Sequence, residues 1–260
     1  MKKRLFIILA IIVVSVIVFG IINYYSFTDN QLAKEEYLQN TDNKNDNIDG
    51  EYIINENDII ASFIASASSK INISDNSVIN EEADFIILGT IDSIDGGINY
   101  NPTKKVYTIP QTIGTLTVNK VIKGKLNENK LSFIRRGGVV SVEEYEKSLF
   151  DSEKTKMTWL NNISAKDKKT KYVSEDFEDD IKLEKNKEYL MYLQYAPDYD
   201  RYVILFFQYG LREIKNDASL KQNYASENNT YENIENIKVK NNVTGEWEDL
   251  NSVIQPNVTK

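Results

Sequence analysis

Residues 45–56 have the spacing of oxygen ligands that a calcium-binding loop requires. Such a loop carries oxygen donors at its first, third and fifth positions, a glycine at the sixth and a bidentate glutamate at the twelfth. Asn45, Asn47, Asp49, Gly50 and Glu56 occupy these positions. Asparagine at the first position removes one of the usual charges, so the pattern predicts a weak calcium site. The alternative is an asparagine-rich linker that fits the pattern through its composition.

A pair of arginines precedes a pair of glycines at Arg135-Arg136-Gly137-Gly138. Guanidinium groups and glycine N–H groups together bind carboxylates and phosphates. The sequence therefore indicates a binding site for an anion at Arg135 and Arg136. The alternative is the end of a strand, where one arginine forms a salt bridge with the acidic surface.

Five carboxylates lie close together at Glu175, Asp176, Glu178, Asp179 and Asp180. This density of negative charge could hold a cation or attract a basic partner. A solvated acidic loop is the alternative interpretation.

Six tyrosines lie between residues 189 and 209. Tyrosine is frequent at partner surfaces, but it also packs well within sheets. Tyr199 falls in the Pro197–Asp200 turn, so we expect it to be the most exposed of the six and to contact a partner.

The composition excludes several classes of catalysis. The chain has no cysteine and no histidine, which removes thiolate nucleophiles, imidazole bases and the usual zinc ligand sets. The nucleophile-elbow, P-loop and S-x-x-K patterns are also absent from the sequence. A binding protein without a cofactor, calcium apart, is the leading prediction, and a carboxylate-based hydrolase is an alternative.

An apolar run from Leu5 to Ile22 follows Lys2, Lys3 and Arg4. As a helix it would extend roughly 27 Å, close to the thickness of the hydrocarbon core. The basic residues predict a cytoplasmic N-terminus and a C-terminal domain outside the cell. A cleaved signal peptide is the alternative, although the run is long and no small-x-small site follows it.

The chain has 31 basic and 39 acidic side chains and a net charge of −8. Without the three basic residues at the N-terminus, the exterior part is more acidic still. Such a charge disfavours nucleic acid as a partner. We therefore expect a protein or a component of the cell envelope to be the partner.

Changes in composition divide the chain into four parts. Residues 1–26 are the cytoplasmic stub and membrane anchor, and residues 27–72 form a polar stalk whose end, 59–71, is expected to be helical. Residues 73–215 form a β-rich domain, in which Ser74 or Asp75 caps a short helix that ends at Glu82. Residues 216–260 are a C-terminal appendage with a hairpin around Val239 and Trp247.

Apolar and alternating runs predict the strands of the domain. They cover residues 84–94, 106–109, 112–122, 130–136, 188–195 and 202–209. Asp95-Gly96-Gly97 is expected to be a turn, Pro110 to interrupt a strand, and residues 142–150 to be helical. The predicted core residues are Leu88, Leu116, Val118, Leu190, Leu205 and Phe207.

Three segments carry a resemblance to a known module. They are Glu82–Gly89, Val118–Gly124 with its Lys-Gly ending, and Glu184–Leu190 with its Tyr-Leu ending. The chain resembles the netrin-like module, which is the OB-type barrel of the tissue inhibitors of metalloproteinases. It is also similar to a class of uncharacterised membrane-anchored proteins of Gram-positive bacteria.

The resemblance implies a mainly β (α+β) fold: an N-terminal transmembrane helix followed by an OB-like β-barrel with helical insertions. The inhibitors act through an N-terminal cysteine, which has no counterpart here, so no inhibitor residue is transferred. The expected function is a non-enzymatic binding module at the cell envelope. A calcium-modulated, adhesin-like module that uses the 45–56 loop is the other binding alternative.

Overall fold

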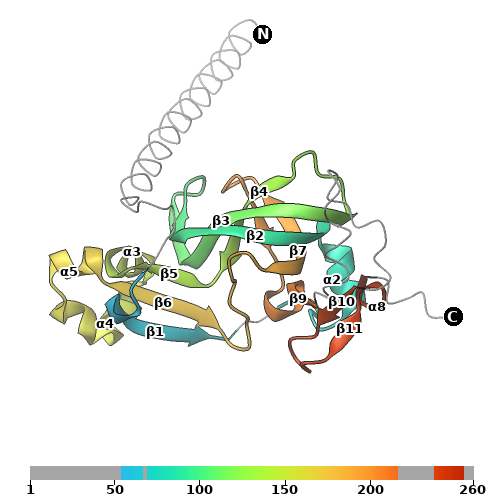
Figure 1. Cartoon of the computed structure of the whole chain (residues 1–260). Helices are drawn as coiled ribbons and strands as arrows, with labels where there is room; N and C mark the ends of the chain where they lie inside the picture. The colour runs from blue at the N-terminus through green and yellow to red at the C-terminus, as the bar shows by residue number, and fades with distance from the viewer. Residues whose placement is uncertain (1–53, 67–68, 216–236, 255–260) are drawn as a thin grey trace, which may run out of the picture.

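The computed structural model describes residues 54–66, 69–215 and 237–254. The fold is mainly β with several short helices, as predicted (Figure 1). Eight strands form a large sheet and three form a small sheet. No helix within these ranges is both long and apolar enough to cross a membrane. The predicted membrane span, residues 5–22, lies outside the described residues.

Strand β2 (Phe85–Asn101) lies at the centre of the large sheet. It pairs antiparallel with β3 (Val106–Lys123) on one side and with β7 (Glu188–Ala196) on the other. Ile87 and Leu88 are both fully buried, but they belong to different apolar clusters. The prediction of a strand with two apolar faces, inside the main sheet, is therefore confirmed.

The remaining strands of the large sheet extend it on both sides of this centre. Its order is β11-β10-β9-β7-β2-β3-β4-β8, and β8 pairs with β7 as well. The predicted 188–209 hairpin is confirmed where β7 pairs antiparallel with β8, and the last hairpin where β10 pairs with β11. The bounds are β4 Lys130–Arg136, β8 Arg201–Ile204, β9 Leu211–Lys215, β10 Lys238–Lys240 and β11 Trp247–Asp249.

The turn expected at Asp95-Gly96-Gly97 is wrong, because β2 continues through these residues. The register with β3 shifts between Ile94 and Gly96, which is a bulge, and Gly96 has a φ of 143°. Gly97 lies so close to the small sheet that a Cβ there would be 1.9 Å from the carbonyl oxygen of Val139. The glycines thus allow a bulge and a close backbone contact rather than a chain reversal.

Two expected strand ends are also displaced. Strand β3 runs through Pro110, which falls where the pairing with β2 is irregular, between Ile98 and Tyr100. An irregular ladder can tolerate the missing N–H of proline. The strand expected over 202–209 ends at Ile204, because the chain then turns into helix α6 (Phe207–Gly210).

The small sheet consists of β1 (Ile59–Ala65), β6 (Tyr172–Phe177) and β5 (Gly138–Ser141), in the order β1-β6-β5. The helix expected over 59–71 is wrong, since β1 alternates between half-buried and exposed residues. A short apolar run does not distinguish a strand from a helix, and its pairing with β6 decides the outcome. Residues 59–65, assigned to the stalk, are thus part of the folded domain.

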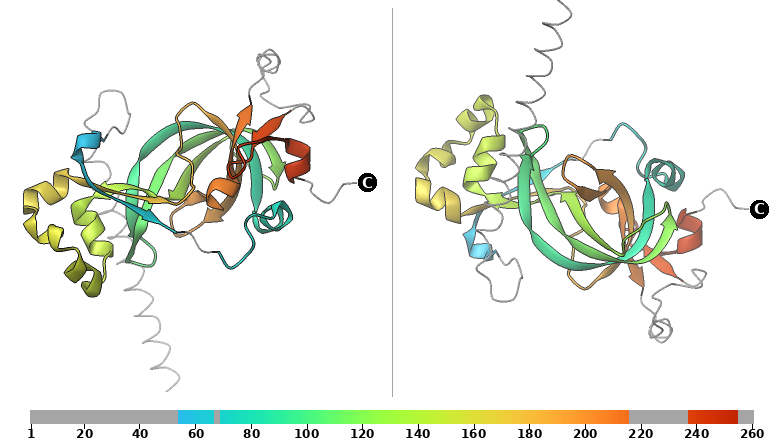
Figure 2. Two further views of the ribbon diagram at one scale, coloured as in Figure 1. Left: turned by 90° about the horizontal axis from the view of Figure 1, so that it is seen from below. Right: turned by 90° about the horizontal axis from the view of Figure 1, so that it is seen from above.

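Short helices cover the two sheets (Figures 1 and 2). Helix α2 (Asn76–Glu82) begins after Asp75, whose side chain accepts from the N–H of Ser77 at 2.8 Å, as the capping prediction requires. It packs with α8 (Leu250–Ile254) against the large sheet. The insertion between β5 and β6 contains α3 (Val142–Ser148), α4 (Asp151–Lys156), η2 (Thr158–Asn162) and α5 (Ala165–Thr170).

Three of the six predicted core residues, Leu88, Leu116 and Leu190, are fully buried. Val118 and Leu205 are half-buried at the margins of the two large clusters. Phe207 is half-buried too, and its ring lies 4.6 Å from that of Phe177 between centroids. Full burial is therefore confirmed for Leu88, Leu116 and Leu190, whereas the other three predicted core residues are only half-buried.

Candidate functional site

The two arginines predicted to bind an anion have different surroundings. The Arg135 side chain is buried, donates from Nη1 to the carbonyl oxygen of Ile181 at 2.6 Å, and forms an ion pair with Asp180. Burial lowers the pKa of Arg135 and raises the pKa of Asp180. Arg136, the next residue of the strand, is exposed. The structure therefore does not bring the two guanidinium groups together.

The glycines after the arginines are also engaged within the fold. The N–H of Gly137 donates to the carbonyl oxygen of Pro110 at 3.0 Å, and its own carbonyl oxygen accepts from Thr112 Oγ1 at 2.7 Å. Gly138 begins β5 and pairs with Glu175. These contacts place the glycine pair at the junction of the two sheets, where it holds β4, β3 and β5 together.

Tyr199, the predicted partner contact, is half-buried against a small apolar cluster that includes Ile98 and Ile134. The more exposed tyrosine of this hairpin is Tyr195, at 43%. Its hydroxyl donates to Asp200 at 2.5 Å, across the turn. The exposure expected for Tyr199 is therefore wrong, because its ring folds back onto the sheet.

The predicted calcium ligands Asn45, Asn47 and Asp49 lie outside the described residues. Glu56 is described: it is exposed and begins the short helix η1 (Glu56–Asp58), whose N-cap is Asn55. Among the described residues, no group of three or more acidic side chains is arranged to hold a metal ion. The calcium loop remains a prediction.

The acidic run 175–180 does not act as a unit. Glu175 is half-buried in β6, and this burial raises its pKa. Asp176 accepts from Ser174 at 3.1 Å, and Asp180 pairs with Arg135. Glu178 and Asp179 remain at the surface, where they face a cleft.

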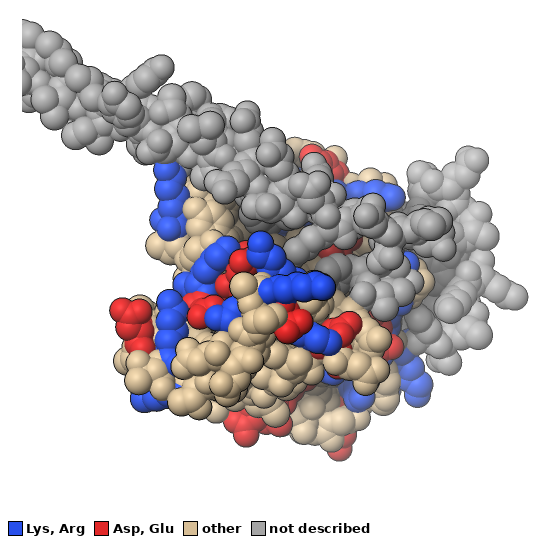
Figure 3. Space-filling view, turned by 90° about the vertical axis from the view of Figure 1, so that its left-hand side faces the viewer, with Lys and Arg blue, Asp and Glu red and all other residues tan. Residues whose placement is uncertain are grey.

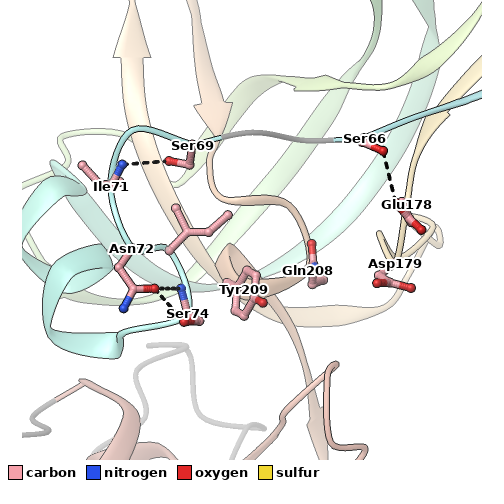
Figure 4. A pocket seen from close by; sticks show the side chains of 10 residues that line it. Ser66, Ser69, Ile71, Asn72, Ser74, Glu178, Asp179, Gln208 and Tyr209 are labelled. Carbon is pink, nitrogen blue, oxygen red and sulfur yellow. Dashed lines mark hydrogen bonds between the residues drawn. The ribbon is translucent and has the colours of Figure 1, made fainter.

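This cleft has a volume of about 330 Å³ and lies where three connecting segments meet (Figure 4). One is the segment after β1, the second is the loop after β6, and the third is α6. Its polar groups are hydroxyls, amides and carboxylates, and two isoleucines complete it. The lining residues are Ser66, Ser69, Ile71, Asn72, Ile73, Ser74, Glu178, Asp179, Gln208 and Tyr209.

The electrostatic character of the cleft is acidic and rich in hydrogen-bond acceptors. Glu178 Oε2 accepts from the Ser66 hydroxyl at 3.2 Å, and Asn72 Oδ1 accepts from the Ser74 hydroxyl at 2.7 Å. No lysine or arginine is among the described residues that line it. A neutral ligand with many hydroxyl groups, or a ligand with an amine, matches this lining.

Residues with positive φ adjoin the cleft on two sides. Asp179 has a φ of 61°, and the consecutive aromatic residues Phe206 and Phe207 have φ values of 62° and 49°. A left-handed conformation at a bulky residue costs on the order of 1–3 kcal/mol and tends to occur where a site requires it. The two phenylalanines direct α6 so that Gln208 and Tyr209 reach the cleft.

The sequence singles out Glu178 and Asp179 in the acidic run and Tyr209 among the six tyrosines, but it does not indicate the other lining residues. Serines and asparagines in a polar segment resemble a linker, and the Phe206–Phe207 turn resembles a continuing strand. No sequence signal reveals that these segments meet. The chain matches no protein-family model and has no match among curated proteins, so its function is inferred from this cleft and from the predicted anchor.

Proposed function

We propose that this chain is a single-pass membrane protein that displays a β-rich binding module outside the cell. The module binds a polar component of the cell envelope in the cleft between β1, β6 and α6, without catalysing a reaction. The observation that supports this proposal best is the lining of the cleft by acceptors and hydroxyls.

The larger part of the module is, in this proposal, an OB-like β-barrel. Its support is that β8 pairs both with β4 and with β7. A path of paired strands therefore leads from β7 through β2, β3, β4 and β8 back to β7. Strands β2 and β3 are long and strongly curved (Figure 2), as closure of a five-stranded sheet requires.

The cleft favours binding over hydrolysis for a geometric reason. A carboxylate-based glycosidase needs two acids on opposite sides of the scissile bond. Glu178 and Asp179 are adjacent on one loop, and the opposite sides of the cleft carry hydroxyl and amide groups. Such groups hold a ligand by hydrogen bonds, and Tyr209 adds an aromatic surface.

The membrane part of the proposal depends on Leu5–Ile22 and on the basic residues that precede it. We expect the intact chain to sediment with membranes, and protease added to whole cells to digest the domain while the N-terminus is protected. Immunoblotting with tags at both ends measures this. A soluble product that begins after residue 26 would instead indicate a cleaved signal peptide.

The cleft can be tested by changing one carboxylate. Asp179→Asn keeps a residue that tolerates positive φ and removes the charge. We expect it to weaken co-sedimentation of the full chain with isolated peptidoglycan by roughly 10-fold, as loss of a charged hydrogen bond predicts. Asp200→Asn is the matched control, because Asp200 also has a positive φ, 52°, and lies in the β7–β8 turn.

The control variant should bind within about 2-fold of the unchanged chain. Equal weakening by both substitutions would show that the effect is one of general charge and would remove the cleft from the proposal. Failure of the unchanged chain to sediment with peptidoglycan would remove this class of ligand.

A further inference from the structure

Strand β1 is an edge strand of the small sheet, and over Ala61–Ala65 the described residues give it little protection against pairing. It forms the outer edge of the small sheet, and within the described part of the chain it pairs with β6 alone (Figure 1). Edge strands normally carry a charge, a proline, a β-bulge or a covering element. The sequence of β1, Ile-Ile-Ala-Ser-Phe-Ile-Ala, contains neither a charge nor a proline, and its pairing with β6 is irregular only between Ile59 and Ala61.

The exposed face of β1 is apolar at two positions. Ile64 is 77% exposed and Ile60 is 41% exposed, with Ser62 between them. Two exposed isoleucines at a spacing of four residues on one strand face are costly in water. Burial of these side chains against a partner would recover this free energy.

The backbone of β1 offers hydrogen bonds in the same place. The carbonyl oxygen of Ala65 accepts from the N–H of Glu178 at 3.0 Å, so the peptide groups of Ala65 point toward β6. Peptide groups alternate in direction along a strand. The ladder with β6 is regular from Ala61 to Ala65, so the peptide groups of Ile64 and Ser62 point to the free edge, and it is irregular between Ile59 and Ala61.

We propose that β1 is a dimerisation strand, and that it pairs antiparallel with β1 of a second copy around a two-fold axis at Ser62. In this register Ile60 of one copy lies opposite Ile64 of the other, on both sides of the axis. Two main-chain hydrogen bonds form at the Ser62 pair, and the Ile60–Ile64 pairs on either side add up to about four more. The two small sheets become one continuous sheet.

The sequence of β1 is complementary to itself in this register. On the exposed face the isoleucines form two Ile60–Ile64 pairs, one on each side of the central Ser62 pair. On the other face, Ala61 lies opposite Phe63 of the second copy, so that a small side chain meets a large one. A two-fold interface requires this kind of self-complementarity, and a binding site for an unrelated segment does not.

Charge near the strand does not oppose the pairing. The nearest acidic residue before β1 is Asp58, and its carboxylate is already paired with Lys171 Nζ at 2.6 Å. The interface is short, so we expect weak association in solution. If residues 5–22 hold both copies in one membrane, the local concentration of the domain rises and favours the dimer.

Disulfide cross-linking tests the register directly, because the chain has no cysteine of its own. Ser62→Cys places two cysteines across the axis with Cα atoms about 5.5 Å apart, which suits a disulfide. Ile60→Cys is the matched control on the same face of the same strand. Its two copies would lie about 13 Å apart along the strand and cannot be bridged.

We expect the full-length Ser62→Cys chain in liposomes to form oxidised dimers at least about 10-fold faster than the Ile60→Cys chain, since only the first pair meets disulfide geometry. A mixture of Ile60→Cys and Ile64→Cys chains should cross-link to each other, whereas neither should cross-link alone. Similar rates for all variants would indicate random collision and would overturn the proposal.

A second substitution tests whether cross-linking depends on strand pairing at the free edge of β1. Ile64→Lys in the Ser62→Cys chain should reduce cross-linking by about 10-fold, since a lysine at this edge blocks pairing. Val243→Lys, at another exposed apolar residue, should leave it unchanged. Absence of cross-linking in the Ser62→Cys chain would also overturn the proposal, and would leave the edge to a segment of the same chain or to a different protein.

Discussion

Two buried arginines hold this fold together in different ways. Arg212 donates from Nε to the carbonyl oxygen of Tyr209 at 3.2 Å, from Nη1 to Glu248 at 2.8 Å and from Nη2 to Asn76 at 2.7 Å. Arg135 pairs with Asp180 and with a carbonyl oxygen, but its buried Nε has no partner among the described residues. Both guanidinium groups are almost fully inaccessible.

The carboxylates of the two pairs differ in their access to water. The Glu248 side chain is 31% exposed, whereas that of Asp180 is 9% exposed. Burial lowers the pKa of Arg135 and raises that of Asp180, so it disfavours the charged form of both partners. The pair therefore fixes the 178–187 connection against β4 at a cost in desolvation. Arg212 joins α2, β9 and the last hairpin with more complete hydrogen bonding.

The largest effect should come from removing the more buried carboxylate. Asp180→Ala leaves the Arg135 charge buried without a counter-charge, and we expect a loss of about 3–5 kcal/mol in the free energy of unfolding. Glu248→Ala should cost only about 1–2 kcal/mol, because Arg212 keeps two other acceptors and the lost carboxylate is partly hydrated. Chemical denaturation of the purified chain measures both values.

A double substitution distinguishes a buried charge from lost packing. Arg135→Met combined with Asp180→Ala removes both charges, and it should recover most of the stability that Asp180→Ala alone loses. A double variant as unstable as the single variant would mean that the pair stabilises the fold through its own attraction. The attraction between Arg135 and Asp180 would then outweigh their desolvation cost, which is the opposite of what their burial leads us to expect.

The sequence was informative where a residue's role is local. The two apolar faces of β2, the hairpin of β7 and β8 and the Asp75 cap follow from patterns within a few residues. The Arg135–Asp180 pair at the end of β4 confirms the strand-end alternative, but no local pattern identifies Asp180, which is 45 residues away along the chain. Arg212 has no local signature, and its contacts come from three separate elements.

The errors share a physical cause. Gly96-Gly97 has the composition of a turn, and only the approach of β5 shows why a strand needs glycine there. The apolar run Tyr202–Tyr209 fits a strand until the positive φ values of Phe206 and Phe207 interrupt it. The cleft depends on that interruption, so it could not be predicted from periodicity. At these positions the backbone conformation is determined by tertiary contacts, which override the local propensity of the residues.

A smaller effect should come from Tyr192, which lies beside the Arg212 network without joining it. Its ring is fully buried, and its hydroxyl finds no hydrogen-bond partner in the described part of the chain. Tyr192→Phe removes a polar group that is buried without compensation, and it leaves the ring in place. We expect the free energy of unfolding at neutral pH to rise by about 1 kcal/mol.

The same substitution should change the response to alkali. Burial raises the pKa of Tyr192 to about 12, while an unfolded tyrosine titrates near about 10. At pH values below the pKa of the unfolded state, Tyr192 is protonated in both states and the free energy of unfolding has its full value. As the pH rises from about 10 to about 12, the unfolded state releases the tyrosine proton first, so the free energy of unfolding falls. Tyr192→Phe should make this fall with pH less steep.

Tyr145→Phe is the control, because burial also raises the pKa of Tyr145 to about 12. Its substitution should make the fall with pH less steep without raising the free energy of unfolding at neutral pH. A loss of stability at neutral pH in Tyr192→Phe would show that the hydroxyl of Tyr192 has a hydrogen-bond partner, and that the hydrogen bonding around Arg212 extends further than its three acceptors.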